Sequence, residues 1–176
     1  MARKFKLEEL NRLSAEAYKV IDKYPFVVIL DNVRSMHNVG SVFRTADAFK
    51  IVKVYLCGIS PTPPHREIHK TALGAEDTVN WEQVSDIRHL ISTLQSQGYH
   101  VAAIEQAEGC ITLSDFTAKE YPKIAVILGN EVEGVSQEAV DLADSVVEIP
   151  QFGTKHSLNV SVAAGIVMYE VSKGFQ

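Results

Sequence analysis

Three short polar stretches follow apolar runs of the chain, and their side chains could carry out chemistry. Together they supply a guanidinium, a carboxylate, two amides and a hydroxyl, from Arg44, Glu131, Asn38, Asn159 and Ser157. Such groups can align a substrate and stabilise negative charge that develops on an oxygen. Each residue alone also fits a plain structural role, such as capping a helix. Their joint occurrence after apolar runs is what predicts a site.

The absence of three common motifs weakens the case for several enzyme classes. The sequence contains no G-x-G-x-x-G after its first apolar run, no G-x-x-x-x-G-K-[ST] and no G-x-S-x-G, which disfavours nicotinamide enzymes, phosphate-loop enzymes and α/β hydrolases. The six histidines show no ligand spacing, so no metal is predicted. Cys57 and Cys110 lack a partner motif and are predicted to be reduced thiols.

The elements that must position these side chains follow from the hydrophobic pattern. Runs rich in β-branched residues predict strands at 26–30, 51–57, 100–105, 123–129 and 145–149, with a further short strand at 78–82. Helical patterns lie at 38–49, 84–98 and 136–143, and a closing helix begins at about 157. Strands that alternate with helices predict a largely parallel sheet, whose ligand sites lie beyond the carboxyl ends of the strands.

The length of 176 residues predicts one domain. Residues 1–24 are predicted to be a helical extension, with Leu7, Leu10, Leu13 and Ala17 on one face packed against a domain at 25–176. The stretch 60–70 is predicted to be a Pro-rich and then basic loop. No apolar run could span a bilayer and no secretion signal is present, so the sequence predicts a cytoplasmic protein without a membrane partner.

Charge is distributed unevenly along the chain. Residues 1–75 hold 12 Lys and Arg against 7 Asp and Glu, residues 76–148 hold 3 against 14, and residues 149–176 hold 2 against 1. The basic segments could form a local positive surface despite the net charge of −5, and a polyanion responds to such a surface. Solvated loops without a partner are the alternative.

Three motifs carry a family resemblance: NVGSVFRTA (38–46), GNEVEG (129–134) and IPQFGTKHSLNVS (149–161). In this order they resemble the SPOUT superfamily of methyltransferases, in the SpoU or TrmH branch that methylates the ribose 2′-hydroxyl of RNA. The segment KTALGAE (70–76) is also similar, and the resemblance covers roughly residues 25–172.

The resemblance implies a fold that periodicity alone does not give. It is a parallel α/β sheet flanked by helices, with the C-terminal segment tucked through a loop as a trefoil knot. The knot would hold S-adenosylmethionine within residues 104–108, 128–134 and 149–159. The implied cofactor-binding residues are Glu105, Leu128, Gly129, Asn130, Ile149, Gln151, Ser157 and Leu158. The closing helix would pack against the core and a second subunit, giving a homodimer; burial within a monomer is the alternative.

The resemblance also implies roles for the polar residues. Arg44 would grip the phosphate beside the target ribose and stabilise the forming alkoxide, with Glu131 orienting its guanidinium and Asn38, Ser157 and Asn159 around it. Because a guanidinium is a poor general base, deprotonation by Arg44 is the second option. Arg34, His37, Arg66 and Lys70 are candidate RNA contacts.

The sequence leaves the RNA target open between transfer RNA and ribosomal RNA. A non-catalytic knotted RNA-binding protein is the alternative function, although its site would not need to keep Arg44, Glu131, Ser157 and Asn159. A small-molecule nucleotide-binding protein of the Rossmann type is a more distant alternative, which the missing glycine-rich loop disfavours.

Overall fold

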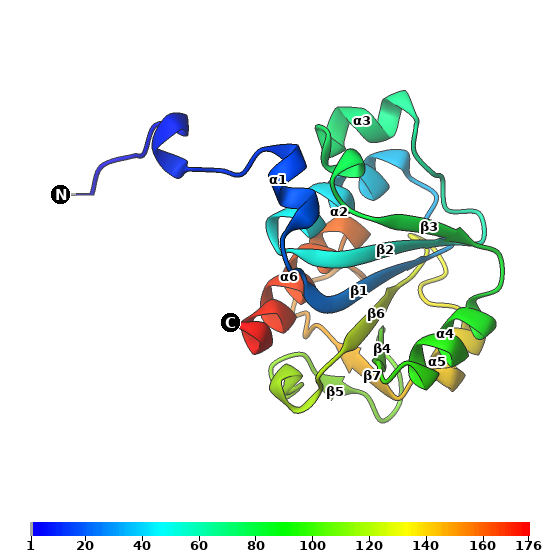
Figure 1. Cartoon of the computed structure of the whole chain (residues 1–176). Coiled ribbons are helices and arrows are strands. Elements are labelled where there is room, and N and C mark those ends of the chain that lie inside the picture. The colour runs from blue at the N-terminus through cyan, green and yellow to red at the C-terminus, as the bar shows by residue number, and fades with distance from the viewer. Residues whose placement is uncertain (1) are drawn as a thin grey trace.

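The computed structural model describes residues 2–176 and is built on a seven-stranded sheet with the order β3-β2-β1-β6-β4-β7-β5 (Figure 1). All neighbouring strands pair in parallel. The strands are β1 (Tyr24–Asp31), β2 (Ile51–Cys57), β3 (Trp81–Val84), β4 (His100–Ile104), β5 (Ile111–Thr112), β6 (Ile124–Leu128) and β7 (Ser145–Glu148). The five strands predicted from β-branched runs are therefore confirmed, and the short strand predicted at 78–82 lies slightly later, as β3.

Strands β1 and β6 form the centre of the sheet because both of their faces are apolar. Every residue of β6 is buried, as are the last six residues of β1. Continuous apolar runs of this kind are typical of parallel strands that helices cover on both sides. Leu30 pairs with Leu56 of β2 and with Leu128 of β6, so the three strands end level with one another.

Helices cover both faces of the sheet. The α-helices are α1 (Ala15–Val20), α2 (Met36–Ala48), α3 (Arg66–Ala72), α4 (Ile87–Ser96), α5 (Gln137–Leu142) and α6 (Val160–Ser172). One apolar core joins α2, α3 and α6 to one face, and a second core joins α4 and α5 to the other. Four short 3-10 helices lie at Leu7–Leu10, Ala75–Asp77, Ala118–Glu120 and Lys173–Phe175.

The closing helix α6 begins with Asn159, whose side-chain oxygen accepts from the backbone N–H of Ser161 at 2.9 Å and so caps it. Its buried face holds Val160, Ala164, Val167, Met168 and Val171. A second apolar face, made of Val162, Ile166 and Tyr169, is 51%, 39% and 56% exposed. The chain alone therefore does not bury this helix on all sides.

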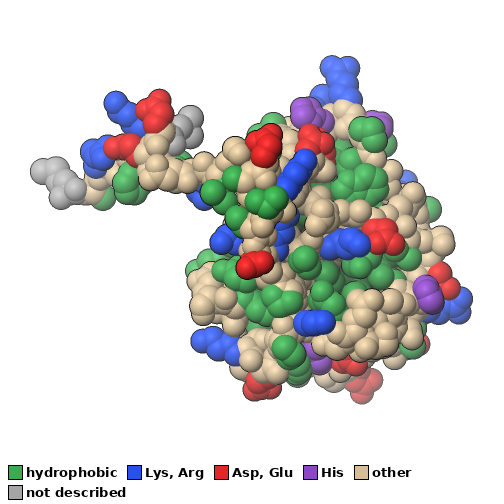
Figure 2. All heavy atoms as spheres, viewed as in Figure 1, with side chains coloured by type: hydrophobic (Ala, Val, Ile, Leu, Met, Phe, Trp, Pro, Cys, Tyr) green, Lys and Arg blue, Asp and Glu red, His purple; other side chains and the backbone are tan. Residues whose placement is uncertain are grey.

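The prediction of one continuous N-terminal helix was wrong. A 3-10 turn at Leu7–Leu10 is separated from α1 by Asn11, which adopts a left-handed conformation (φ 47°) and ends the first turn. Leu10 and Leu13 are exposed, so this segment is not packed against the domain, and Figures 1 and 2 show it extending away from the body. The hydroxyl of Tyr18 in α1 donates to the carbonyl of Asp47 at 2.6 Å and attaches α1 to α2.

The segment predicted as a basic loop after 60 contains α3, which is the second difference. His65 caps it through Nδ1, which accepts from the backbone N–H of Glu67 at 3.1 Å. Ile68 and Ala72, one turn apart, are its buried residues.

Among residues 2–176, no helix is long and apolar enough to cross a membrane.

Candidate functional site

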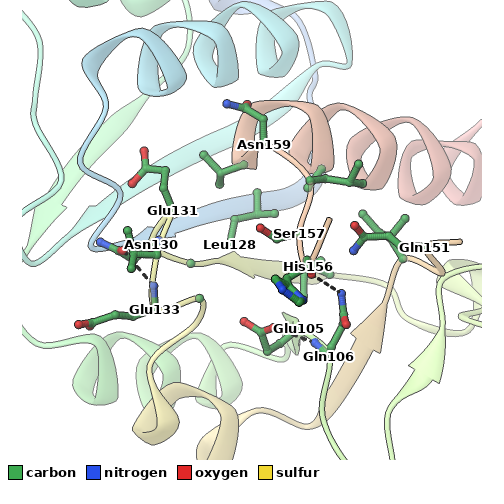
Figure 3. Close-up of a pocket in the computed structure, with 18 residues that line it drawn as sticks. Glu105, Gln106, Leu128, Asn130, Glu131, Glu133, Gln151, His156, Ser157 and Asn159 are labelled. Carbon is green, nitrogen blue, oxygen red and sulfur yellow. Dashed lines mark hydrogen bonds between the residues drawn. The ribbon is translucent and has the colours of Figure 1, made fainter. Parts of the chain in front are cut away.

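A cavity of about 480 Å³ opens at the carboxyl edge of the sheet, where β4, β6 and β7 end (Figure 3). Its walls come from the segments 104–106, 128–134 and 149–163. These segments meet because β4 lies between β6 and β7, so that the loops following all three strands leave from one edge. The volume falls within the range of small-molecule sites.

Three polar side chains form one chain of hydrogen bonds beside the cavity, and they come from the first turn of α2, the loop after β6 and the N-cap of α6. Asn159 Nδ2 donates to Asn38 Oδ1 at 3.1 Å, and Asn38 Nδ2 donates to Glu131 Oε1 at 2.9 Å. Both asparagine amides are thereby fixed in orientation, since each must donate in one direction and accept in the other. The structure thus brings together one residue from each polar motif of the sequence.

The carboxylate of Glu131 is held by two further donors from the loop after β1. The backbone N–H groups of Arg34 and Ser35 donate to its two oxygens at 3.0 Å each. Burial raises the pKa of Glu131, but the hydrogen bonds from Arg34, Asn38 and Ser35 outweigh it, so that the pKa lies below its ordinary value. Glu131 is therefore a fixed anion at neutral pH.

No hydrogen bond joins Glu131 to Arg44 in residues 2–176, so the orientation of the guanidinium by Glu131 stays a prediction. Its hydrogen bonds join it to Arg34, Ser35 and Asn38 instead. Arg44 lies on the exposed side of α2, does not line the cavity, and has no hydrogen bond or ion pair to residues 2–176. The sequence showed that both groups follow strand ends, but not that α2 carries Arg44 away from the loop of Glu131.

The loop 129–135 is folded tightly back on itself. Asn130 and Gly134 exchange both backbone hydrogen bonds, at 2.8 and 3.0 Å. A Cβ at Gly129 would overlap the backbone of Gly134 and Val135, so glycine is required there by the loop itself. Glu105 anchors the loop by accepting from the backbone N–H of Val135 at 2.9 Å.

The structure places all eight predicted cofactor residues in the cavity wall: Glu105, Leu128, Gly129, Asn130, Ile149, Gln151, Ser157 and Leu158. Val160 and Ala163 of α6 also line it, and the sequence ranges did not include them. In the sequence, only helical periodicity could have indicated these two residues, because Ala163 lies about one helical turn after Asn159. Gln106 Nε2 donates to the carbonyl of His156 at 3.2 Å and joins two walls of the cavity (Figure 3).

Three of the four candidate RNA contacts lie on or beside α3. His37 Nε2 lies 3.0 Å from Glu67 Oε2, and Lys70 Nζ donates to Glu67 Oε1 at 2.7 Å. The hydrogen bonds from Lys70 and then His37 lower the pKa of Glu67. Arg66 is exposed on the same helix, whereas Arg34 is exposed on the loop after β1.

Within the described part of the chain, no cluster of three or more His, Cys, Asp or Glu side chains could hold a metal ion.

Comparison with known proteins shows which family the chain resembles. Residues 25–169 match the model of the SpoU rRNA methylase family. The chain is 33% identical over 147 residues to a tRNA (guanosine(18)-2′-O)-methyltransferase of Thermus thermophilus, covering 83% of this chain and 73% of that protein. It is 32% identical to the 23S rRNA (guanosine-2′-O-)-methyltransferase RlmB of Vibrio vulnificus, covering 83% of this chain and only 58% of that protein.

Solved structures of methyltransferases share the fold of this chain. A TrmH/SpoU tRNA-modifying enzyme of Aquifex aeolicus superposes with a TM-score of 0.79 at 28% identity, covering 91% of this chain and 79% of that one. An AdoMet-bound rRNA methyltransferase of Sinorhizobium meliloti has a TM-score of 0.81 at 26% identity, covering 90% and 60%. The family model matches most of the chain, and hydrogen bonds join its three polar motifs beside a cavity at the strand ends. The chain therefore belongs to the SpoU rRNA methylase family.

Proposed function

We propose that this protein methylates a ribose 2′-hydroxyl of transfer or ribosomal RNA, with S-adenosylmethionine as the methyl donor. The observation that carries the proposal is the hydrogen-bonded chain of Asn159, Asn38 and Glu131 at the rim of the strand-end cavity. It presents fixed polar groups to a substrate immediately beside a space of cofactor size. The relatives named above, which act on tRNA and 23S rRNA, support RNA as the substrate.

The cavity fits the cofactor by the chemistry of its walls. Leu128, Ile149, Leu158 and Val160 provide apolar surface for an adenine ring, and Glu105, Gln106 and Ser157 provide polar groups nearby. The cofactor would supply an activated methyl group on a sulfonium. Calorimetry should detect binding of S-adenosylhomocysteine and none of NADH.

Cofactor binding is tested better at Ala163 than at Gly129. A valine at Gly129 would disrupt the loop 129–135 whether or not the cofactor binds there, because its Cβ would meet backbone. Leucine in place of Ala163, in the cavity wall on α6, would instead fill cavity space. Weaker binding of S-adenosylhomocysteine by a folded Ala163→Leu variant is the expected result, and unchanged binding would place the cofactor elsewhere.

The roles of the chain's own residues follow from their positions. Asn38 and Asn159 would orient the ribose, and Ser157, exposed in the cavity wall, would lie beside them. Glu131 would hold the loop after β1 in place through the N–H groups of Arg34 and Ser35. Arg44 would stabilise the forming alkoxide and grip a phosphate, with deprotonation of the hydroxyl as the second option. This role requires the substrate-bound assembly to bring the guanidinium to the ribose.

We also propose the knot and the homodimer. Residues of the segment 149–159 and of the loop 129–135 line the same cavity before the chain enters α6, as we expect of a chain threaded past that loop. The exposed face of Val162, Ile166 and Tyr169 would pack against a second copy, since apolar side chains aligned along a helix commonly mark an interface. The cytoplasmic location and the division at residue 24 stay predictions from the sequence.

The position of Arg44 outside the cavity favours one alternative, a knotted protein that binds RNA without methylating it. Incubation with labelled S-adenosylmethionine and unmodified transfer or ribosomal RNA, followed by mapping of the labelled nucleotide, separates the two. Label in a ribose 2′-O-methyl group is the expected result. RNA binding without any transfer of label would contradict the enzymatic proposal.

A further inference from the structure

A second cavity, of about 600 Å³, lies between the loop 129–135 and the loops that follow β1 and β2. Four residues of the loop, Asn130, Val132, Glu133 and Gly134, line both this cavity and the first one. A group bound in the second cavity would therefore touch the same loop that carries Glu131 at its start. The two cavities form neighbouring compartments at one edge of the sheet.

The floor of the second cavity is fixed by hydrogen bonds, and Ser136 Oγ is the one buried side-chain oxygen in its lining without a hydrogen-bond partner among the described residues. Asp31 is 1% exposed, and its two oxygens accept from the backbone N–H of Ser136 and from Asn32 Nδ2, both at 2.8 Å. The side-chain oxygen of Asn32 in turn accepts from the backbone N–H of Ile59 at 3.2 Å. The floor thus sets the shape of the cavity and offers one hydroxyl, and the charged and apolar groups available for recognition lie in its exposed walls.

The exposed walls carry two charges of opposite sign and two apolar side chains. Arg34 and Glu133 are both exposed, and no ion pair joins either to any residue within 2–176. Ile59 and Val132 are 67% and 82% exposed although both are apolar. In Figure 3 the carboxyl end of Glu133 points away from Ser157 and His156, so it is free on the side of the second cavity.

We propose that the second cavity holds the base of the target nucleotide and that Glu133 determines which base is accepted. This inference rests on the proposed function. Ile59 and Val132 would cover the faces of the flat ring, as apolar side chains do for unstacked bases. Arg34 would bind a neighbouring phosphate, for which its fork of donors is suited.

The chemistry of Glu133 selects guanine among the RNA bases. A carboxylate only accepts hydrogen bonds and can take two neighbouring donors at once. Guanine presents N1–H and N2–H side by side on its Watson–Crick edge, whereas adenine, cytosine and uracil place an acceptor beside each donor. With guanine in the second cavity, the attached ribose would lie toward Glu131 and Asn38, at the boundary with the first cavity.

The first test compares Glu133→Gln with Glu120→Gln. Glu120 is an exposed carboxylate at the end of a 3-10 helix before β6 and lines neither cavity. Removing a negative charge should strengthen RNA binding or leave it unchanged if Glu133 is only a surface residue. If Glu133 reads the base, methylation efficiency (kcat/KM) should instead fall about 10-fold or more, while Glu120→Gln stays near wild type and the affinity for S-adenosylhomocysteine is unchanged. Equal behaviour of the two variants would overturn the assignment.

The second test replaces the methylated nucleotide itself. Mapping should place the methyl group on a guanosine, and a methylated adenosine, cytidine or uridine would overturn the inference. Inosine lacks the N2 amino group, so an inosine at that position should lower the efficiency of the wild type about 5-fold or more. Glu133→Gln should discriminate less between the two bases. Unchanged discrimination in that variant would assign base recognition to another residue.

Binding of free nucleotides separates a failure of the pocket from a failure of the proposed function. Guanosine 5′-monophosphate, titrated into the wild type and observed by NMR, should perturb the residues around Ile59 and Glu133 and bind more tightly than inosine 5′-monophosphate. If no RNA were methylated but this preference were present and depended on Glu133, the methyltransferase proposal would fail and the pocket would stand. Absence of the preference in an enzyme that methylates RNA would overturn the pocket alone.

Discussion

Glu131 shows how one carboxylate can set the pH dependence of a site. Its pKa lies below the ordinary value because hydrogen bonds from Arg34, Asn38 and Ser35 outweigh the effect of burial. A group whose folded-state pKa is depressed contributes stability above its unfolded pKa of about 4.3, and this contribution disappears as the pH falls through the folded pKa. We therefore expect the melting temperature of the wild type to fall more steeply between about pH 5 and pH 3 than that of Glu131→Gln.

The matched control for this prediction is Glu120→Gln, which changes an exposed carboxylate far from the site. Its melting curve should follow the wild type at each pH, because no hydrogen-bonded network is lost. Parallel pH profiles for the wild type and Glu131→Gln would mean that the hydrogen bonds to Glu131 add nothing measurable to stability. Calorimetric melts in matched buffers give this comparison directly.

Arg44 is the second residue with a sharp expectation. If it acts on charge present only in the transition state, Arg44→Ala should lower turnover by roughly 100-fold or more while the affinity for S-adenosylhomocysteine stays constant. Arg44→Lys should restore little, since one ammonium cannot reproduce a planar fork of donors. Single-turnover methylation with saturating cofactor measures the effect, with Arg88→Ala as an exposed control on α4. A wild-type rate in Arg44→Ala would remove this residue from the mechanism.

At this scale the sequence predicted the types of residue in the site better than their partners. Asn38, Glu131 and Asn159 were expected together and form one hydrogen-bonded chain. The partners of Glu131 are mainly backbone N–H groups of the loop after β1, and any residue type can supply those. No pattern of side chains could therefore have indicated that Arg44 would be left without this carboxylate.

At the scale of elements, the contact between α2 and α3 depends on a glycine. A Cβ at Gly40 would overlap Thr71 Oγ1 and the carbonyl oxygen of Ile68, so the two helices are packed too closely for any side chain there. Gly40→Ala should therefore lower the free energy of unfolding by about 1–3 kcal/mol, the usual cost of an overpacked contact. Chemical denaturation monitored by circular dichroism measures this change.

The same substitution at Gly165 is the control, made in the Ile166→Glu variant that should be monomeric, because a Cβ there has open space within the single chain but lies on the α6 face proposed for the dimer. Gly165→Ala should raise the free energy of unfolding by about 0.5–1 kcal/mol, since alanine is the better helix former. Opposite signs for one substitution in two helices would show that packing, and not helix propensity, makes Gly40 necessary. A stabilising Gly40→Ala would contradict the close approach of α2 and α3.

Elements with a long run of apolar residues were predictable from the sequence. Elements that depend on one or two specific contacts were not. Strand β6 and the part of β1 from Pro25 to Leu30 are apolar, and both strands were expected within a residue or two of their observed ends. Strand β5 has two residues, which are too few to show an alternating apolar pattern, and it is a strand only because its backbone pairs with β7. Helix α3 was missed because a histidine caps it and only two of its residues are buried.

At the scale of the whole molecule, the exposed apolar face of α6 makes oligomeric state a direct test. Ile166→Glu should convert a homodimer to a monomer, because the charge would have to be buried in the interface without a partner. Val20→Glu, at an 82% exposed apolar residue of α1, should leave the dimer intact. Light scattering at micromolar concentration distinguishes the two. A wild type that is monomeric and still binds S-adenosylhomocysteine would contradict the dimer.

The distribution of charge predicts how RNA binding responds to salt. Affinity should fall steeply between about 50 and 200 mM salt as phosphate contacts release counterions. Reversal of charge at Arg66 and Lys70 should weaken RNA binding and flatten the salt dependence, without a change in affinity for S-adenosylhomocysteine. Lys70 already pairs with Glu67, so the change at Arg66 should have the larger effect. Equal loss of both affinities would indicate a misfolded α3.

The central position of β6 has a consequence for synthesis on the ribosome. In β1, Leu30 pairs with Leu56 on one side and with Leu128 on the other, so the second edge of β1 stays open until about 100 further residues have been made. At about 5–20 residues per second this interval lasts about 5 to 20 seconds. During that time a strand that is apolar from Pro25 to Leu30 presents unpaired backbone groups to other nascent chains. Translational pausing before residue 128 should therefore favour aggregation of the emerging polypeptide.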